Sequence, residues 1–129
     1  SWRSVAEDGS TVEPLGPAPL GYVVYTADRH MITTISEPDR APIGGDPLAG
    51  PEAARLRAFA TFLSYSGTFR IEGGEVVHGV EMSLFPDWIG TEQRRTAEMS
   101  PDGQTLTLST APVAAGGRVG RHVLTWERV

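Results

Sequence analysis

The sequence predicts a mainly β protein, an antiparallel up-and-down barrel of about eight short strands with one α-helix. Three observations lead to this prediction. Short segments alternate between apolar and polar residues, which is typical of strands with one buried face. The 15 glycines and 10 prolines fall mostly between these segments, where turns need their backbone angles. One stretch alone has the spacing of a helix. A barrel of this size holds either packed side chains or one small ligand.

The strands are expected, in chain order, at about 1–7, 20–27, 30–36, 68–72, 75–84, 91–99, 104–110 and 119–128. Two hairpin turns are marked by Gly73-Gly74 and by Pro101-Asp102-Gly103.

The helix is expected over about 51–66, where Pro51 suits a first helical position and Gly67 would end it. Its apolar residues recur at three- and four-residue spacing, so we expect it to cap one end of the barrel or to pack against the wall. The Pro- and Gly-rich stretch before it, 36–50, is interpreted as a surface loop.

Composition limits the function classes. A chain of 129 residues without repeats fits a single domain, 1–129, that buries its own core. A net charge of −5 with scattered basic residues argues against a nucleic-acid or anionic membrane partner. The absence of cysteine excludes disulfides, thiolate metal sites and a thiol nucleophile. No run approaches the length of a membrane span and no signal peptide is visible, so we expect a cytoplasmic protein, although a trimmed N-terminus would hide a targeting segment.

Strand parity predicts which side chains face inward. In 75–84 one face carries Val76, His78, Val80, Met82 and Leu84. The apolar members of three other strands set their inner faces, and these are Phe69, Ile71, Leu106, Leu108, Leu124 and Trp126. In 91–99 the alternate residues from 92 to 98 are mostly charged and are assigned to the outer face. The inner row is then Thr91, Gln93, Arg95, Ala97 and Met99. This inner row is unusually polar.

His78 stands in the middle of an apolar row, and two interpretations stay open. It is either a core histidine whose ring nitrogens are satisfied by neighbours, or a cavity-lining group that moves a proton or binds a ligand. Gln93 and Arg95 should lie on the adjacent strand, and Tyr25 joins them if its row points in.

Arg95 is the more informative residue. A buried guanidinium without an anion costs several kcal/mol, and the strand glutamates all face outward by parity. Its partner is therefore a loop acid such as Asp46 or Asp87, carbonyls and water, or a ligand with a carboxylate, enolate or polarised carbonyl. In the ligand case Arg95 would stabilise negative charge, Gln93 would add a hydrogen bond and His78 would move a proton.

Aromatic residues supply a second group of candidates. Tyr25, Tyr65 and Trp126 are either plain core or ligand contacts. Phe85 and Trp88 flank Pro86-Asp87 on a connection between strands, where they would form a portal over the barrel mouth or a hydrophobic plug.

Other chemistry lacks support in the sequence. The three histidines have no metal-ligand spacing, no nucleophile elbow or nucleotide-binding glycine loop occurs, and no pair of inward acids suits a glycosidase. We therefore expect neither a metal nor a cofactor.

Several segments together resemble the small bacterial lipocalin-like domain family. They are GYVVYTADRHM at 21–31, PDR and DPLAG in the loop, FLSYSGTFRI at 62–71, HGVEMSLFPDWIGTEQRR at 78–95, TLTLST at 105–110 and the terminal LTWERV. In this resemblance Trp2 is the tryptophan of an opening GxW motif, which implies that a few residues precede Ser1. Arg29 replaces the glycine usual after the turn aspartate, and Arg94, Thr96 and Ala97 replace residues more often apolar or aromatic.

The resemblance implies a barrel with a cavity, not one chemistry, because barrels of this shape serve as carriers and as cyclases or isomerases of natural-product pathways. Two functions stay open. One is a cofactor-free isomerase or cyclase acting on a hydrophobic, polyketide-like metabolite, and the other is a non-catalytic carrier that sequesters such a ligand. The polar inner row favours a cavity over a filled barrel. The sequence leaves the oligomeric state open.

Overall fold

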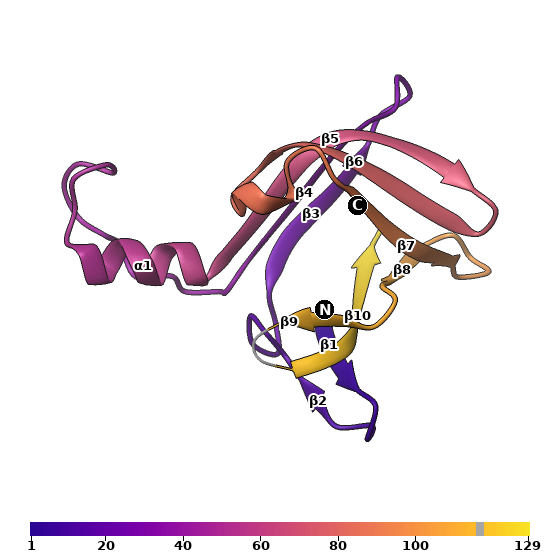
Figure 1. Cartoon of the computed structure of the whole chain (residues 1–129), viewed down its shortest axis with the longest axis horizontal. Helices are drawn as coiled ribbons and strands as arrows, with labels where there is room; N and C mark the ends of the chain where they lie inside the picture. The colour runs from indigo at the N-terminus through magenta and orange to yellow at the C-terminus, as the bar shows by residue number, and fades with distance from the viewer. Residues whose placement is uncertain (116–117) are drawn as a thin grey trace.

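The computed structural model describes residues 1–115 and 118–129, and strands make up most of the chain (Figure 1). The elements are β1 Trp2–Ala6, β2 Thr11–Val12, β3 Leu20–Tyr25, β4 His30–Ser36, α1 Glu52–Ala60, β5 Phe62–Glu72, β6 Glu75–Ser83, the 3-10 turn η1 Pro86–Trp88, β7 Glu92–Met99, β8 Thr105–Ser109, β9 Val113–Ala115 and β10 Arg118–Glu127. The eight predicted strands are all present, and both predicted hairpin turns join the expected pairs. The short strands β2 and β9 were not predicted.

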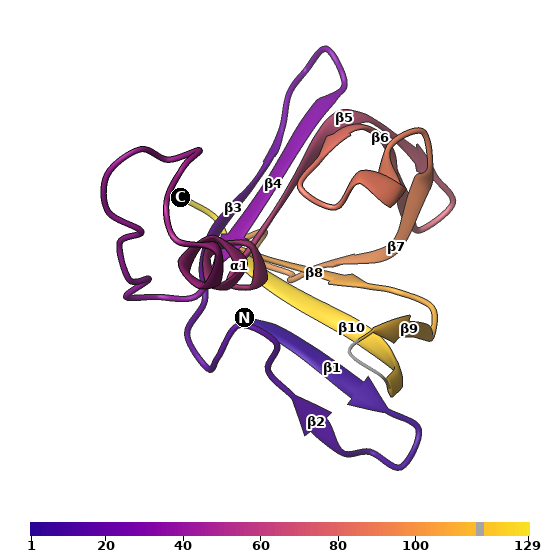
Figure 2. The ribbon, with the colours of Figure 1, turned by 60° about the vertical axis from the view of Figure 1, so that its left-hand side comes forward.

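The strands form one antiparallel sheet of ten strands in the order β2-β1-β10-β8-β7-β6-β5-β4-β3, with β9 paired to β10. Figure 2 shows this sheet curling round from β3 and β4 to β10 and β1. In the described ranges no ladder joins β3 to β1 or β2, so the barrel stays open along one side. One reason is that β2 occupies the free edge of β1, where Ser4 faces Val12. The mainly β, up-and-down fold class is confirmed, with an open rather than a closed sheet.

The helix is shorter than predicted. It ends at Ala60, with Thr61 at its C-cap, and the following residues form the first half of β5. This half pairs with the whole of β4, from Phe62 opposite Ser36 to Thr68 opposite His30. The prediction of helix to residue 66 was wrong because this long ladder outweighs local helix propensity.

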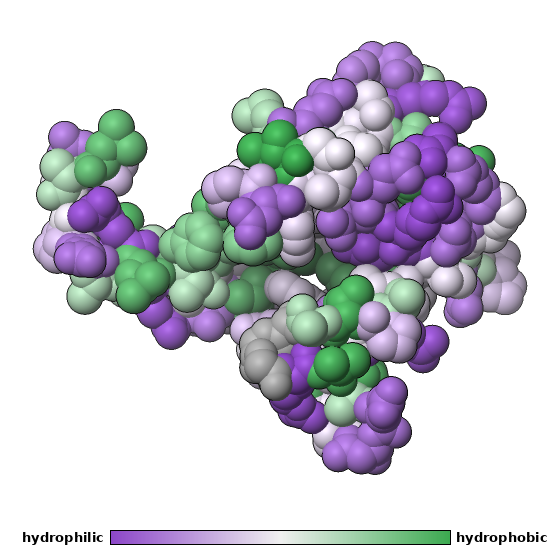
Figure 3. Space-filling view, in the orientation of Figure 1, coloured by the Kyte–Doolittle hydropathy of each residue, from purple (hydrophilic) through white to green (hydrophobic). Residues whose placement is uncertain are grey.

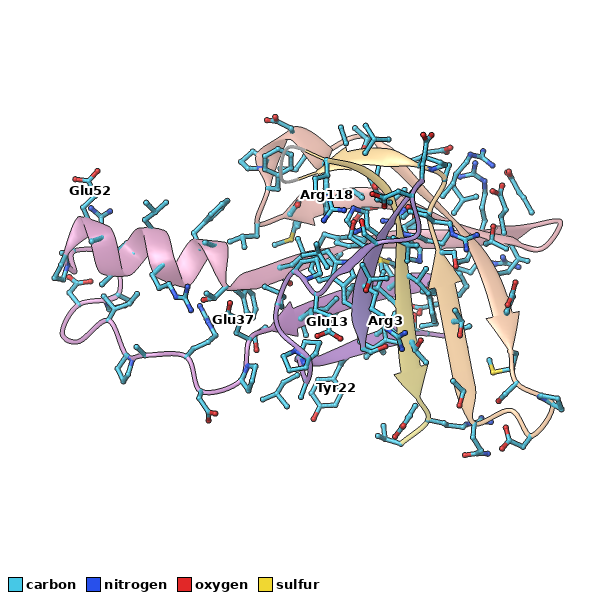
Figure 4. The ribbon with its side chains drawn as sticks, turned by 90° about the horizontal axis from the view of Figure 1, so that it is seen from below. Arg3, Glu13, Tyr22, Glu37, Glu52 and Arg118 are labelled. Carbon is cyan, nitrogen blue, oxygen red and sulfur yellow. The ribbon has the colours of Figure 1, made fainter. Side chains whose placement is uncertain are left out.

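The position of α1 also differs from the expectation. None of its residues is buried, and it extends away from the sheet with Glu52 near its far end (Figures 1 and 4). Instead of covering the barrel, it holds the preceding loop. Arg57 pairs with Glu37 of that loop at 2.7 Å, and Arg40 donates to the Ala58 carbonyl at 2.7 Å.

A β-bulge changes which side chains of β6 face inward. Val80 lies opposite Gly67 and Met82 opposite Ser66, so Glu81 is one residue extra. Val76, His78 and Val80 are buried as predicted, but beyond the bulge the faces exchange and Met82 is 69% exposed. Two backbones also approach closely here, since a Cβ on Gly67 would lie 1.9 Å from the Gly79 carbonyl oxygen.

Strand parity was otherwise a good guide to the interior. On β7, Gln93, Arg95 and Ala97 are half-buried while the alternate residues are exposed. Thr91, Ile71 and Met99 were predicted to face inward but are exposed, because they lie at strand ends beyond the covered interior. Tyr22 of β3 points away from the sheet (Figure 4), whereas Tyr25 is half-buried.

The outer face of β5, β6 and β7 carries a network of charges. Arg70 and Arg94 each pair with both Glu72 and Glu92, and Arg94 also pairs with Glu75. Hydrophilic residues gather over this part of the sheet in Figure 3. The stems of the two arginines lie beside Val77, which explains why this outward residue is fully buried.

Candidate functional site

A cavity of about 370 Å³ lies inside the curled sheet, within the size range of small-molecule sites. It is lined by Trp2, Thr33, Ile35, Leu63, Tyr65, Trp88, Gln93, Arg95, Leu108, Thr110, Val113, Ala114, His122, Leu124 and Trp126. Of the eight residues named from the sequence, Tyr65, Trp88, Gln93, Arg95 and Trp126 line it. The wall is mostly apolar, with a few polar groups on β5, β7 and β10.

His78 lies behind the cavity wall and is fully buried. Its Nε2 lies 2.8 Å from the hydroxyl of Tyr25 and its Nδ1 lies 2.9 Å from the hydroxyl of Tyr65. Burial, and secondarily the charge of Arg95, lowers the pKa of His78 to about 4, so its ring is neutral at pH 7. A neutral ring donates from one nitrogen and accepts at the other, so both nitrogens are satisfied. This geometry fits the first interpretation, a core histidine with satisfied neighbours.

Tyr65 connects this buried group to the cavity. Its side chain is 5% exposed, lines the cavity and bonds to His78. Burial raises the pKa of the Tyr65 phenol, an effect that Arg95 opposes, and burial also raises the pKa of Tyr25. Both hydroxyls therefore remain protonated at neutral pH. Tyr25 does not line the cavity itself.

Arg95 faces the cavity without a carboxylate. Its guanidinium donates to the Arg94 carbonyl at 2.9 Å and to Gln93 Oε1 at 3.4 Å. In the described part of the chain, no salt bridge includes Arg95. Of the three alternatives for its partner, the loop acid is not observed, since neither Asp46 nor Asp87 pairs with Arg95. Backbone carbonyls, the Gln93 amide, solvent and a ligand are the partners that remain.

His122 is a cavity residue that the sequence reasoning did not select. It is 9% exposed, and its Nδ1 accepts a hydrogen bond of 3.1 Å from the Trp2 indole. An indole N–H only donates, so the neutral ring carries its proton on Nε2. Burial and then Arg95 lower the pKa of His122, which favours this neutral form. The parity of Leu124 and Trp126 on the same strand was the signal that could have found it.

The aromatic candidates separate into two groups. Trp88 packs edge-on against Tyr65, with ring centroids 5.6 Å apart, and lines the cavity. Phe85 also packs edge-on against Trp88, with ring centroids 5.7 Å apart, and does not line the cavity. Trp126 lines the cavity, but its buried indole Nε1 has no hydrogen-bond partner among the residues that the structure describes. The three tryptophans of the chain all line the cavity.

The open side of the sheet lies next to the cavity. A second hollow of about 400 Å³ lies there, between β10 and β1 on one side and β3 on the other. Trp2, Ile35 and Trp126 line both this hollow and the inner cavity. The two spaces are therefore adjacent.

Within residues 1–115 and 118–129, no helix is long and apolar enough to cross a membrane. No group of three or more histidine or acidic side chains in these ranges could hold a metal ion.

Comparison with known proteins adds two findings. The sequence matches the lipocalin-like domain family over residues 1–129. It is also 35% identical, over 95 residues, to the 4′-hydroxy-3′-methoxypropiophenone carrier protein of Aspergillus oryzae, covering 67% of this chain and 84% of that protein.

The backbone conformation at Arg29 explains why glycine is expected at this position. Arg29 has a φ of 67°, a left-handed conformation that favours glycine.

Proposed function

Because the chain belongs to the lipocalin-like domain family, we propose that it is a non-catalytic carrier of a small hydrophobic metabolite, bound in the cavity. The observation that carries this proposal is a cavity of about 370 Å³ whose cation, Arg95, has no acidic partner in the described residues. The related fungal protein is named as a carrier of an aromatic ketone, which supports the same class of ligand. A cytoplasmic location remains part of this proposal.

The position of His78 favours carriage over catalysis. A general base needs a nitrogen within hydrogen-bond reach of its substrate. Both nitrogens of His78 bond to tyrosine hydroxyls, and the ring does not line the cavity. The His78 ring is therefore not positioned to act directly as a base on a ligand in the cavity.

One observation favours the second candidate, a cofactor-free isomerase or cyclase. The hydroxyl of Tyr65 bonds to His78 and belongs to a side chain on the cavity wall. This pair would pass a proton between the ligand and His78. Arg95 would then stabilise an enolate.

A binding experiment with an exchange readout separates the two candidates. We expect 4′-hydroxy-3′-methoxypropiophenone to bind with 1:1 stoichiometry by isothermal titration calorimetry. If the protein is a carrier, the α-protons of the ketone should exchange in D2O at the same rate with the protein as in buffer alone. NMR measures this exchange. An increase of about 100-fold or more that is lost in Tyr65→Phe would favour the isomerase instead. Absence of binding would contradict both.

A further inference from the structure

The unpaired polar groups on the cavity wall are mostly hydrogen-bond donors. The guanidinium of Arg95 has N–H groups to spare, and His122 presents Nε2–H because the Trp2 indole occupies Nδ1. The neighbouring acceptor is already used, since Gln93 Oε1 accepts from Arg95. A ligand that fits this wall must therefore supply an acceptor.

Arg95 and His122 lie close enough to share that acceptor. Thr96 faces Ser109, so Arg95 lies beside Thr110 in the next position of the ladder. Thr110 in turn exchanges hydrogen bonds of 2.9 and 3.0 Å with the backbone of His122. Two strand spacings separate Arg95 from His122, about 10 Å between their Cα atoms, which a long arginine side chain spans.

The charge around this pair is uncompensated. Arg95 is the one lysine, arginine or acidic side chain among the described residues that line the cavity. The titratable groups that feel its charge are Tyr25 of β3, Tyr65 of β5, His78 of β6 and His122 of β10. All four are neutral at pH 7, and no described acidic side chain pairs with the guanidinium. A half-buried cation with no anion favours an anionic ligand.

The rest of the wall sets the shape of the ligand. Trp2, Tyr65, Trp88 and Trp126 give the cavity an aromatic lining, which suits a flat conjugated molecule. An oxygen attached directly to such a ring system becomes acidic, because conjugation spreads the charge of its anion. A phenol or enol therefore combines the flat body with the anion that Arg95 requires.

We infer that the cavity binds a flat phenol or enol as its anion, with the ionised oxygen held between the Arg95 guanidinium and Nε2–H of His122. This inference rests on the proposed function and adds the class of ligand. On binding, the ligand O–H bond breaks, its electron pair stays on oxygen and the proton passes to bulk water. Trp2 acts as a positioning residue, because its indole keeps the donor of His122 on Nε2.

The test uses 4′-hydroxy-3′-methoxypropiophenone and its methyl ether, 3′,4′-dimethoxypropiophenone, which cannot ionise. The phenolate absorbs at longer wavelength than the phenol, so absorbance against pH reports the pKa of the bound probe. We expect binding to lower that pKa by about one unit or more, as an adjacent cation does, and the ether to bind about tenfold more weakly or worse.

Variants assign the effect to the two donors. Arg95→Met should abolish the pKa shift of the probe, while Arg94→Met, which removes the same charge from the outer face, should keep it. His122→Phe should reduce the shift, and His122→Gln, which retains an amide N–H, should preserve most of it. Trp2→Phe should give a smaller shift than wild type.

Two failures are distinguishable. If both probes bind equally tightly and the phenol keeps its free pKa, the anion inference is overturned while the carrier proposal stands. If neither probe binds, the carrier proposal fails and the inference falls with it.

Discussion

Arg94 and Arg95 are neighbours in sequence with opposite environments. Arg94 faces outward and pairs with glutamates, whereas Arg95 faces the cavity and, among the described residues, bonds to Gln93 and a backbone carbonyl. The alternation of β7 separates them, and it could be predicted from sequence because the outward charges mark one face. The contacts of His78 could not, since one of its partners, Tyr65, belonged to a segment predicted as helix.

The buried ring of His78 predicts a loss of stability in acid. Its folded pKa of about 4 is below the value of 6.5 for a free side chain. Above about pH 6.5 the ring is neutral in both states, and its contribution is intact. As the pH falls toward 4, His78 becomes protonated in the unfolded chain while it stays largely neutral in the folded protein. This difference lowers the free energy of unfolding by up to about 3 kcal/mol.

Chemical denaturation at about pH 7 and about pH 4.5 measures this loss. We expect His78→Gln to lose less stability between these two values than wild type. Part of the loss should persist in His78→Gln, because the pKa of His122 is also lowered. An identical acid loss in wild type and His78→Gln would contradict the assignment.

Most of the strands and both hairpin turns could be predicted, because alternation and turn residues are local signals. The end of α1 could not, because residues 62–67 become a strand only by pairing with β4. The bulge at Glu81 and the β2 strand that blocks closure depend in the same way on pairing between distant segments. Sequence parity therefore placed Gln93, Arg95 and Ala97 of β7 correctly and misplaced Met82, which lies beyond the bulge.

The close approach of β5 and β6 predicts that Gly67 tolerates no side chain. A Cβ there would lie 1.9 Å from the Gly79 carbonyl oxygen, so the paired backbones would have to separate. We expect Gly67→Ala to lower the free energy of unfolding by more than about 2 kcal/mol. Gly74→Ala in the adjoining turn meets nothing within 4 Å and should change it by less than about 0.5 kcal/mol. Equal stabilities of the two variants in urea denaturation would contradict this account of the bulge.

At the scale of the whole molecule, the open sheet and the cavity belong together. The sheet curls far enough to enclose about 370 Å³, yet its unpaired side leaves a second hollow leading to the same residues. A filled interior would have to satisfy Arg95 with protein groups, and the described residues supply no acid for it. This form is what the proposed carrier function requires, in which a bound ligand would balance the charge of Arg95.

In the proposed function, the cation of Arg95, which has no acidic partner among the described residues, binds a ligand inside the sheet. Because all three tryptophans line the cavity, their fluorescence reports occupancy directly. Titration with 4′-hydroxy-3′-methoxypropiophenone should change this fluorescence saturably, with affinity at least about tenfold weaker in Arg95→Met and within about twofold of wild type in Arg94→Met. Equal affinities for wild type and Arg95→Met, or no change in tryptophan fluorescence at any ligand concentration, would contradict the account.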